Sequence, residues 1–516
     1  MRLEAQDLVP LDHKLNHTKV LIAVMLLAAV LRFWGLGSKS LWLDEIMSQR
    51  RARGTFSQMI GEVAAGDAHP PGYYALQWLA KPLGRSEFAV RVPAAVAGVA
   101  VVLATYLLGG ALLGGVGGLA AAGGLGAAAF AAISPFQIYY SQEARPYALA
   151  MLLASLSLWL LLRLLAAPSA SKPAASCALP WIAYTLLASA MLYTYYYLAF
   201  VLVAEGAILA ASWPQSKRII KRWLVSRAAA AALFAPYLLV LAQRMAAAQE
   251  APPLQSRIDV LASLPGAFAH MLTGFDLEWL NAGPAASAVV YAIALVPAAL
   301  ALAMLRSNRL AFSSALLFVL IPAGAVLVLP WRLQVFEPKH LAFVAPMLMI
   351  LAVYVPVRYA ARPVAWLGVG LLAALNVVSL ADYRDAEFQK ERWPEACEIL
   401  RENARPGDVI AFNPPWIAYG FDHYCPRAAR PDPAQDLSRP AACPPLAIGP
   451  GAKRLWIVRE YGSNVAPALP EIDLQLGKLI VEQQLEQAEF QWQSEQRTEA
   501  LLPGHAGTLE ARLYRW

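Results

Sequence analysis

The chain has 516 residues, of which 59% are hydrophobic and only 15% are charged, and its formal net charge is +7. A soluble domain usually carries about 25% charged residues, so this composition excludes that class and favours a membrane protein. The basic residues form no dense tract with interleaved aromatic side chains, so nucleic acid is not an expected partner. The four cysteines show no CxxC or Cys/His spacing, so we expect no disulfide-rich scaffold, no metal site and no cofactor.

Apolar runs long enough to cross a bilayer as helices recur from the N-terminus to residue 381. We predict an α-helical polytopic membrane protein with about eleven spans, over residues 18–36, 91–112, 116–134, 146–165, 179–196, 197–213, 226–244, 284–305, 310–329, 341–357 and 364–381. The fifth and sixth spans are expected to turn at Tyr195-Tyr196-Tyr197. The first run could instead be a cleaved signal peptide, but the aromatic residues Phe33, Trp34 and Trp42 favour a retained helix.

The distribution of Lys and Arg predicts the orientation, because cytoplasmic loops carry an excess of both. Basic residues crowd the segments 217–227, 306–309 and 358–362, which fall on one side of the membrane under the predicted count. That side is then the cytoplasm. An odd number of spans places the C-terminal tail on the extracytoplasmic side of the inner (plasma) membrane.

The composition changes near residue 382, which predicts a multispanning domain at 1–381 and a soluble extracytoplasmic domain at 382–516. Residues 393–405 have the pattern of a helix, and residues 408–412, 454–458 and 512–516 have the pattern of short strands. We therefore expect a small α/β domain. Cys425 and Cys443 enclose a proline-rich loop, and a disulfide between them is plausible in an oxidising compartment; Cys397 would then be left over.

The stretch at 109–126 is rich in glycine. A phosphate-binding loop would need a preceding strand and a lysine, and neither is indicated. Gly110, Gly114 and Gly118 recur at four-residue spacing, which favours close packing of two membrane helices.

Three polar clusters lie on the predicted outer side, and the first is the pair Asp44-Glu45. Acidic side chains at a bilayer are costly and are usually functional. Neighbours on a helix diverge by about 100°, so only one of the two can point at a given atom. One carboxylate could act as a general base, while the other orients a partner or binds a substrate hydroxyl. The alternative is an acidic pair solvated by lipid headgroups.

Next along the chain comes a histidine followed by two prolines, in Asp67-Ala68-His69-Pro70-Pro71. The prolines fix an extended turn, after which Tyr73 and Tyr74 begin a short helix along the interface. His69 could bind a sugar hydroxyl or a phosphate, and Tyr73 could contact the same substrate. Alternatively, His69 is a turn residue and the tyrosines belong to the aromatic belt.

The second and third polar clusters, at residues 142–147 and 337–340, each precede a span. Glu143 and Arg145 stand before Pro146, which suits the first turn of the fourth span. The outward N-terminus of that helix and the side chain of Arg145 both favour an anion. Lys339 and His340 open the tenth span in a similar way. The alternatives are a Glu–Arg salt bridge and snorkelling of the lysine at the interface.

Carboxylates and cations at one membrane face indicate transfer of a group from a phosphate leaving group. A base removes a proton from an acceptor hydroxyl, and the cations stabilise the departing phosphate. Such a site requires no general acid, and it can dispense with a metal when Arg and Lys supply the charge.

In these residues the chain resembles the GT-C superfamily of membrane glycosyltransferases, and within it the protein O-mannosyltransferases and the lipid A aminoarabinose transferases. The shared pattern consists of Leu43-Asp44-Glu45, of His69-Pro70-Pro71 with Tyr73-Tyr74, of residues 86–94 (SEFAVRVPA) and of residues 141–147 (SQEARPY). The resemblance is strongest over residues 20–200, diffuse from there to residue 381, and weak in the tail.

The resemblance implies a polyprenyl-phosphate-linked sugar donor, an extracytoplasmic active site and inversion at the sugar carbon. It implies that Asp44 is the catalytic base, that Glu143 is the second acidic residue, and that Arg145 and Lys339 contact the donor phosphate. The other substrate-binding candidates are Glu45, His69, Tyr73 and His340. The expected partners are the donor, a lipid, glycan or protein acceptor, and membrane lipids.

Two other functions compete with this one. A transporter or flippase of lipid-linked saccharides would carry ionisable groups near the bilayer midplane and two matching halves. Here the ionisable groups gather at the predicted outer edge, with Glu205 as the exception. An envelope scaffold whose tail binds a partner would leave the three polar clusters unexplained.

Overall fold

The computed structural model describes residues 11–114, 120–166, 178–247, 256–274, 283–328, 336–384, 391, 393–403, 409–413, 418–425, 454–461, 486–488 and 508–515. They belong to two compact units. The membrane unit comprises Met1–Leu36 and Arg51–Tyr383, and the tail unit comprises Gly37–Arg50 and Arg384–Trp516. The predicted domain boundary near residue 382 differs from this division mainly because residues 37–50 belong to the tail unit.

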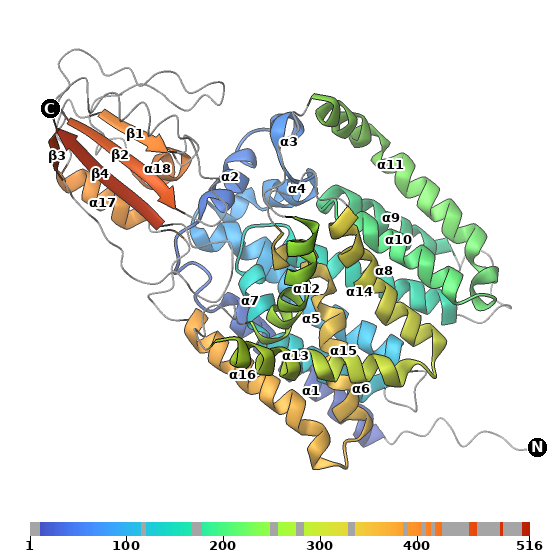
Figure 1. The fold of residues 1–516 in the computed structure, drawn as a ribbon. Helices are drawn as coiled ribbons and strands as arrows, with labels where there is room; N and C mark the ends of the chain where they lie inside the picture. Colours follow the sequence, from blue (N-terminus) through green and yellow to red (C-terminus); the bar gives the residue numbers. More distant parts are fainter. Residues whose placement is uncertain are drawn as a thin grey trace, which may run out of the picture. The chain divides into compact units, whose positions relative to one another are not determined.

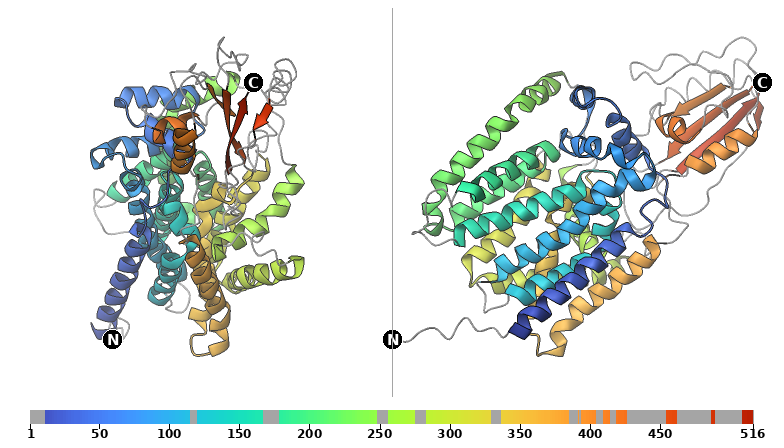
Figure 2. Two further views of the ribbon diagram at one scale, coloured as in Figure 1. Left: turned by 90° about the vertical axis from the view of Figure 1, so that its left-hand side faces the viewer. Right: turned by 180° about the vertical axis from the view of Figure 1, so that it is seen from behind.

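The described part of the membrane unit is helical, and Figures 1 and 2 show its longer helices running side by side. In chain order its elements are α1 (Leu11–Phe33), α3 (Phe56–Gly66), α4 (Gly72–Leu79), η1 (Lys81–Leu83), α5 (Glu87–Leu113), α6 (Ala120–Ile133), α7 (Pro135–Ser141), α8 (Tyr147–Ala166), α9 (Ala178–Thr194), α10 (Leu198–Ala211), η3 (Gln215–Arg218), α11 (Ile220–Ala247), α12 (Arg257–Thr273), α13 (Gly283–Leu305), α14 (Arg309–Val328), η6 (Pro338–Val344), α15 (Ala345–Arg358), η7 (Pro363–Trp366) and α16 (Leu367–Tyr383). Helix α2 (Leu43–Arg51) begins in the tail unit, and its last residue belongs to the membrane unit.

Within the described residues, six helical segments are long and apolar enough to cross a bilayer: α5, α8, α13 and α14, most of α11, and η6 together with α15. Helices α6 and α7 make a seventh if they are one span, bent by 63° between them. Helices α9, α10 and α16 are apolar but shorter. The chain is therefore a multi-pass membrane protein, as predicted, although the number of eleven spans stays a prediction.

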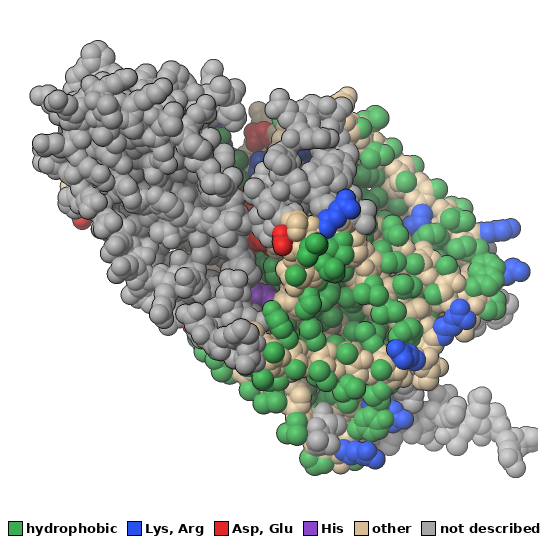
Figure 3. Space-filling model, in the orientation of Figure 1, with side chains coloured by type: hydrophobic (Ala, Val, Ile, Leu, Met, Phe, Trp, Pro, Cys, Tyr) green, Lys and Arg blue, Asp and Glu red, His purple; other side chains and the backbone are tan. Residues whose placement is uncertain are grey.

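Each of the eleven predicted ranges overlaps described helical residues, and the turn at Tyr195–Tyr197 lies between α9 and α10 as expected. The prediction missed α12, because its first turn carries Arg257 and Asp259 and so interrupts the apolar pattern. That turn is closed by a capping box, in which Ser256 accepts from the N–H of Asp259 and Asp259 accepts from that of Ser256. Hydrophobic side chains cover much of the membrane-unit face in Figure 3, which suits contact with lipid.

Helix α5 lies at the centre of the first part of the membrane unit and packs against α6, α8 and α1. A Cβ atom on Gly124 would lie 2.6 Å from the carbonyl oxygen of Tyr106, and one on Gly109 would lie 3.1 Å from Cα of Gly124. Glycine therefore permits the close approach of α5 and α6, which confirms the helix-packing interpretation of this stretch. The contact includes Gly109 and Gly124 together with the predicted Gly110, whose backbone nitrogen would lie 3.2 Å from a Cβ on Gly124, whereas Gly118 lies outside the described residues.

Helix α1 is attached to the loop that carries the second polar cluster. The buried guanidinium of Arg32 donates to the carbonyl oxygens of Ala131 (3.0 Å) and Ala132 (3.1 Å) near the end of α6, where helical carbonyls lack partners. The side-chain amide of Gln142 in turn donates to the carbonyl oxygens of Arg32 (3.0 Å) and Trp34 (2.9 Å). The start of the 142–147 segment is thereby fixed against the end of α1.

The tail unit contains a four-stranded sheet in the order β1-β2-β4-β3, formed by Val409–Asn413, Arg454–Tyr461, Thr508–Arg515 and Glu486–Ala488 respectively (Figure 1). Strands β1 and β2 are parallel, and the other two pairs are antiparallel. Helices α17 (Trp393–Asn403) and α18 (Ala418–Tyr424) complete the described elements. The predicted helix and strands coincide with α17, β1, β2 and β4, whereas a complete α/β domain stays a prediction because much of the tail lies outside the described residues.

The disulfide plausible from sequence, between Cys425 and Cys443, is wrong. Cys397 on α17 is bonded to Cys425, with 5.3 Å between their Cα atoms, and Cys443 lies outside the described residues. The packing of α17 against α18 brings these two sulfurs together. Sequence spacing alone does not determine which cysteines pair.

Candidate active site

Asp67 is the residue around which the first part of the site is built. It follows α3 as its C-cap and precedes the two prolines before α4. Its carboxylate accepts from the backbone N–H of His69 (2.8 Å) and from the hydroxyl of Tyr74 (2.7 Å), and it pairs with Arg51 at 2.6 Å. Its carbonyl oxygen accepts from Arg244 of α11 at 2.5 Å. Asp67 thereby fixes the conformation of the segment that carries His69.

The environment of Asp67 keeps it negatively charged. Burial alone would raise the pKa of this carboxyl. The hydrogen bond with His69 and the positive charges of Arg51 and Arg145 outweigh burial and hold the pKa well below its usual range. A buried carboxylate with several partners is therefore present beside the histidine.

His69 contacts Arg145 from the 142–147 segment. Nη2 of Arg145 lies 3.1 Å from Nδ1 of His69, and both side chains are buried. The pair therefore offers the positive charge of a guanidinium beside an imidazole ring.

The segment that carries Arg145 turns sharply between α7 and α8. Helix α7 is capped by Ser134, whose hydroxyl accepts from the N–H of Gln137 at 3.4 Å. The N–H of Arg145 donates to the carbonyl oxygen of Glu143 at 2.7 Å, and α8 begins two residues later, as its proline predicts. Glu143 is completely buried. The sequence between the two helices thus presents Arg145 at the start of α8.

The third polar cluster precedes α15. Nζ of Lys339 pairs with the carboxylate of Glu337 at 2.8 Å, and both side chains are buried. The backbone N–H of Glu337 donates to Nδ1 of His340 at 3.0 Å, which closes the first turn of η6. This local turn holds the lysine and the histidine in fixed positions.

A stack of four rings connects the first loop to the third cluster. His69 stacks on Tyr195 with 5.5 Å between ring centroids, Tyr195 lies 5.3 Å from Tyr197, and Tyr197 stacks on His340 at 5.7 Å. Tyr147 of α8 meets the rings of His69 (6.3 Å) and Tyr195 (5.9 Å) edge-on. We call the four rings the aromatic column. It brings together segments that lie more than 250 residues apart, with Arg145 next to one end and Lys339 next to the other.

This arrangement can neutralise an anion. Arg145 and Lys339 are cations in a buried environment, where charge-assisted hydrogen bonds are stronger than in water. The aromatic rings offer flat apolar faces beside these cations. Cations beside aromatic rings suit a ligand that consists of a phosphate with a ring or a chain attached to it.

The chain is similar to known proteins in sequence and in fold. The family model described as dolichyl-phosphate-mannose-protein mannosyltransferase matches residues 68–239, which include His69, Arg145 and the tyrosine turn. A comparison with curated protein sequences returned no match.

Two solved structures share the fold over most of the chain. The structure of ArnT from Cupriavidus metallidurans bound to undecaprenyl phosphate has a TM-score of 0.54 at 14% identity, and covers 96% of this chain and 97% of its own. The archaeal oligosaccharyltransferase AglB from Archaeoglobus fulgidus, in complex with an inhibitory peptide and a dolichol-phosphate, has a TM-score of 0.50 at 13% identity, and covers 87% and 70%. The chain has the fold of the GT-C membrane glycosyltransferases. The resemblance inferred from the sequence is confirmed.

The structure brings the predicted site residues of the membrane unit together to different extents. His69 and His340 form the two ends of the aromatic column, Arg145 contacts His69, and Lys339 precedes His340 in the chain. Tyr73 instead belongs to the first turn of α4, where its hydroxyl accepts from Gln77 at 2.7 Å and its ring meets that of Tyr74. The chemical roles assigned to these residues stay predictions.

Asp44 and Glu45 belong to the tail unit, in the first turn of α2. Asp44 is half-buried, whereas Glu45 is completely buried. A carboxylate oxygen of Glu45 lies 3.4 Å from the backbone nitrogen of Trp42, which donates to it across the start of α2. The two neighbours are thus in different environments, and Asp44 is the more accessible carboxylate of the pair.

Sequence reasoning assigned no role to Asp67, Tyr195 and Tyr197, and it included Glu337 in the third polar cluster without giving it a role. Asp67 lies two residues before His69 in the sequence. Its position ahead of the two prolines was the one signal that could have indicated its role in fixing this turn. The tyrosines had the pattern of a hairpin at the membrane interface, and only packing places their rings between two histidines. Among the residues that the structure describes, no group of three or more His, Cys, Asp or Glu could hold a metal ion.

Proposed function

We propose that this chain is a membrane glycosyltransferase that moves a sugar from a polyprenyl-phosphate donor to a hydroxyl group of a lipid, glycan or protein. The observation that carries the proposal is the buried Arg145 against His69 at one end of the aromatic column, with Lys339 and its partner Glu337 beside His340 at the other. Undecaprenyl phosphate and dolichol-phosphate are present in the solved structures that share this fold, and both contain a phosphate on a long apolar chain.

In the proposed reaction, Asp44 is the general base. It takes the proton of the acceptor hydroxyl, and the acceptor oxygen attacks the anomeric carbon of the sugar from the face opposite the phosphate. A new carbon–oxygen bond forms while the bond to the phosphate oxygen breaks. The bonding electrons leave with the polyprenyl phosphate, so the configuration at the sugar carbon is inverted.

Arg145 and Lys339 supply positive charge to the departing phosphate in this scheme. Because the phosphate is an anion both before and after transfer, the same two residues bind donor and product. His69 and the aromatic column are assigned to the sugar in this scheme. Glu143 is assigned as the second acidic residue, and Glu45, Tyr73 and His340 as further contacts on the substrate side.

A transporter is not favoured, because the ionisable pair inside the helical bundle has a packing function. Glu205 of α10 accepts from the hydroxyls of Ser157 and Tyr184, each at 2.6 Å, and pairs with Arg227 at 3.2 Å. These bonds connect α10 to α8, α9 and α11. A carboxylate engaged by three side chains serves helix packing rather than a translocation path.

The proposal places the site and the domain at 382–516 on the extracytoplasmic side of the inner membrane. Reporter fusions after Trp213 and after Arg392 should then report opposite sides. If both fusions report the same side, the predicted topology is wrong.

Mass spectrometry of envelope glycolipids and glycoproteins from cells with and without the chain tests the function directly. We expect one sugar to be absent from a class of lipid, glycan or protein in cells without the chain, while the free polyprenyl-phosphate-linked sugar accumulates. A simultaneous loss of the donor itself from the extracytoplasmic leaflet would instead support a flippase.

A further inference from the structure

We propose that Glu391 of the tail unit is a positioning residue for Asp44, because it caps the helix that carries the acidic pair. This inference rests on the proposed function through the role of Asp44 as the base. Glu391 is 348 residues away from the helix in the sequence, so no local pattern indicates the contact.

At a helix N-terminus the first backbone N–H groups have no carbonyl partner one turn earlier in the helix, so a side chain can cap them. A carboxylate oxygen of Glu391 accepts from the N–H of Leu43, the first residue of α2, at 3.1 Å. The same carboxylate accepts from the indole N–H of Trp393 at 2.5 Å. The negative charge therefore lies at the positive end of the helix dipole and is itself held in place by a buried tryptophan.

Two further contacts hold the residues that lead into α2. The hydroxyl of Ser40 donates to the carbonyl oxygen of Glu391, and the N–H of Leu41 donates to the hydroxyl of Tyr424 at 2.6 Å. Three positions before and at the start of the helix are thus tied to the tail. Because Asp44 follows Leu43 directly, the direction of its side chain depends on these bonds.

The tail supports this arrangement with a small hydrophobic cluster. Buried side chains of the first loop pack with those of α17 and α18; they are Leu41, Ile46, Trp393, Ala396, Cys397, Leu400, Phe421 and Cys425. Gly420 is required here, since a Cβ on it would lie 2.1 Å from the ring of Trp393. The disulfide between Cys397 and Cys425 joins α17 to the residue that follows Tyr424. This packing and the disulfide thus hold the start of α2 in place within the tail unit.

Removal of the cap should reduce turnover more than donor binding. Displacement of a catalytic group by about 1 Å can lower the rate by about 100-fold. The residues assigned to the donor phosphate, Arg145 and Lys339, belong to the membrane unit and do not depend on the cap. A split between kcat and phosphate affinity therefore distinguishes positioning from a general loss of structure.

The test uses the full-length chain with Glu391→Ala, Glu391→Gln and the matched control Glu398→Ala, an exposed glutamate of α17. Sugar transfer is measured in membranes that contain each variant, and affinity is measured with undecaprenyl phosphate. We expect Glu391→Ala to lower kcat by at least about tenfold with an unchanged Kd for undecaprenyl phosphate. Glu391→Gln, which keeps an acceptor oxygen, should recover most of the rate. A kcat for Glu391→Ala equal to that of Glu398→Ala would overturn the proposal.

A milder change and a structural measurement keep the inference testable if Glu391→Ala folds poorly. Tyr424→Phe removes one hydroxyl, and Tyr419→Phe is its control on the same helix. Hydrogen–deuterium exchange in the full-length protein should become faster in residues 41–48 for Glu391→Ala and Tyr424→Phe, and stay unchanged for both controls. Unchanged exchange in this segment would contradict the capping role of Glu391. If the variants exchange faster but the wild-type protein transfers no sugar, the capping role stands and the proposed function is rejected.

Discussion

The residues predicted to form one site are held in two different ways. In the membrane unit, His69, Arg145 and His340 are held mainly by ring stacking and by contacts between side chains. In the tail unit, the segment before Asp44 is held by its backbone, through hydrogen bonds to Glu391 and Tyr424 and through the hydrophobic cluster.

This difference follows from the two surroundings. Helices in a bilayer satisfy their own backbone groups, so side chains at helix ends are what remains to build a site. A loop outside the bundle must find partners for its backbone, and here the tail provides them. We infer that helix packing in the membrane unit fixes the positions of Arg145 and Lys339. The positions of Asp44 and Glu45 depend instead on the fold of the tail. Five substitutions test this comparison.

The largest effect is expected for Asp44→Asn. The change keeps the shape of the side chain but removes the proton acceptor, so transfer should fall by about 10²–10⁴. Binding of undecaprenyl phosphate should stay nearly intact, since the cations belong to the membrane unit. Asp422→Asn, in α18 of the same tail unit, serves as the control. Turnover at the wild-type rate in Asp44→Asn would reject the assignment of the base.

Arg145→Gln and Lys339→Gln should give the opposite result. Each removes a charged donor, and hydrogen bonds to charged groups contribute about 1.5–3 kcal/mol, so the affinity for undecaprenyl phosphate should fall roughly 10–100-fold. The sugar-loaded donor should be affected equally. Arg163→Gln, in the last turn of α8, and Glu45→Gln should leave the affinity close to that of the wild type. A titration with unchanged affinity for both Arg145→Gln and Lys339→Gln would remove the phosphate role.

Asp67→Asn should destabilise the membrane unit, by about 3 kcal/mol at neutral pH, because it breaks a buried ion pair. The pKa of Asp67 is lower in the folded chain than in the unfolded one. Its stabilising effect is therefore complete above the ordinary carboxyl pKa near 4 and is lost as the pH falls through the folded value. Thermal unfolding of both proteins should show a Tm difference that is largest near pH 7 and shrinks below about pH 4. A difference that does not change with pH would contradict this origin.

The smallest effect is expected at the contact of α5 with α6. Gly124→Ala places a methyl group against the carbonyl oxygen of Tyr106, and such overpacking costs about 1–3 kcal/mol. Gly61→Ala is the matched control, because nothing lies within 4 Å of a Cβ there and alanine suits a helix better than glycine. Thermal unfolding should show a lower Tm for Gly124→Ala and an equal or higher one for Gly61→Ala. The reverse order would show that this interface tolerates larger residues.

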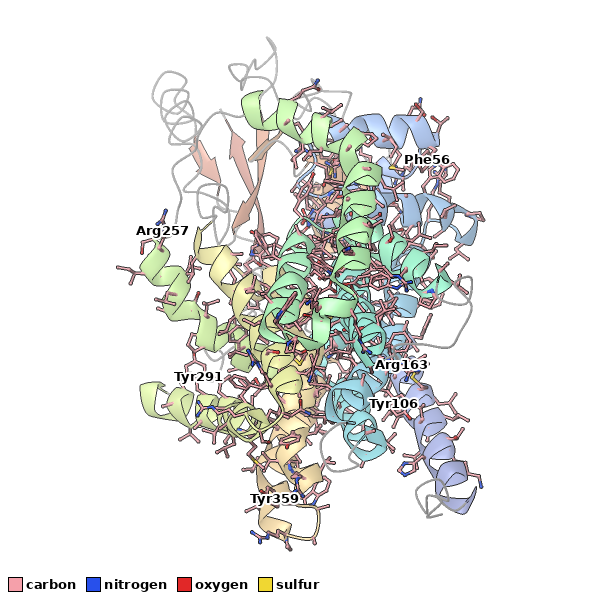
Figure 4. All side chains as sticks on the ribbon, turned by 90° about the vertical axis from the view of Figure 1, so that its right-hand side faces the viewer. Phe56, Tyr106, Arg163, Arg257, Tyr291 and Tyr359 are labelled. Atoms are coloured by element: carbon pink, nitrogen blue, oxygen red, sulfur yellow. A yellow bond between two sulfur atoms is a disulfide. The ribbon has the colours of Figure 1, made fainter. Side chains whose placement is uncertain are left out.

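The two ends of the bundle illustrate how far the sequence predicts the fold. Figure 4 places Phe56 of α3 at one end of the membrane unit and Tyr359, just after α15, at the other. The apolar runs of the sequence predicted the long helices of this unit, because the length of an apolar run is enough to identify a helix that can cross a bilayer. Helix α12 was missed because Arg257 and Asp259 give it the polarity of a loop. The short helix after Pro71 was predicted correctly, since two prolines restrict the chain before it.

The sequence by itself determined which residue types were available for chemistry and roughly where the helices begin. Proline before α8, the histidine before two prolines and the acidic pair are local patterns, and local patterns are fixed by periodicity and by backbone restrictions. Only the tertiary structure decided which of these residues are in contact. It placed Arg145 against His69, 76 residues earlier in the chain, paired Cys397 with Cys425, and gave Leu43 its cap from Glu391, 348 residues away. Such partners depend on how helices and strands pack, and neighbouring sequence does not encode that packing.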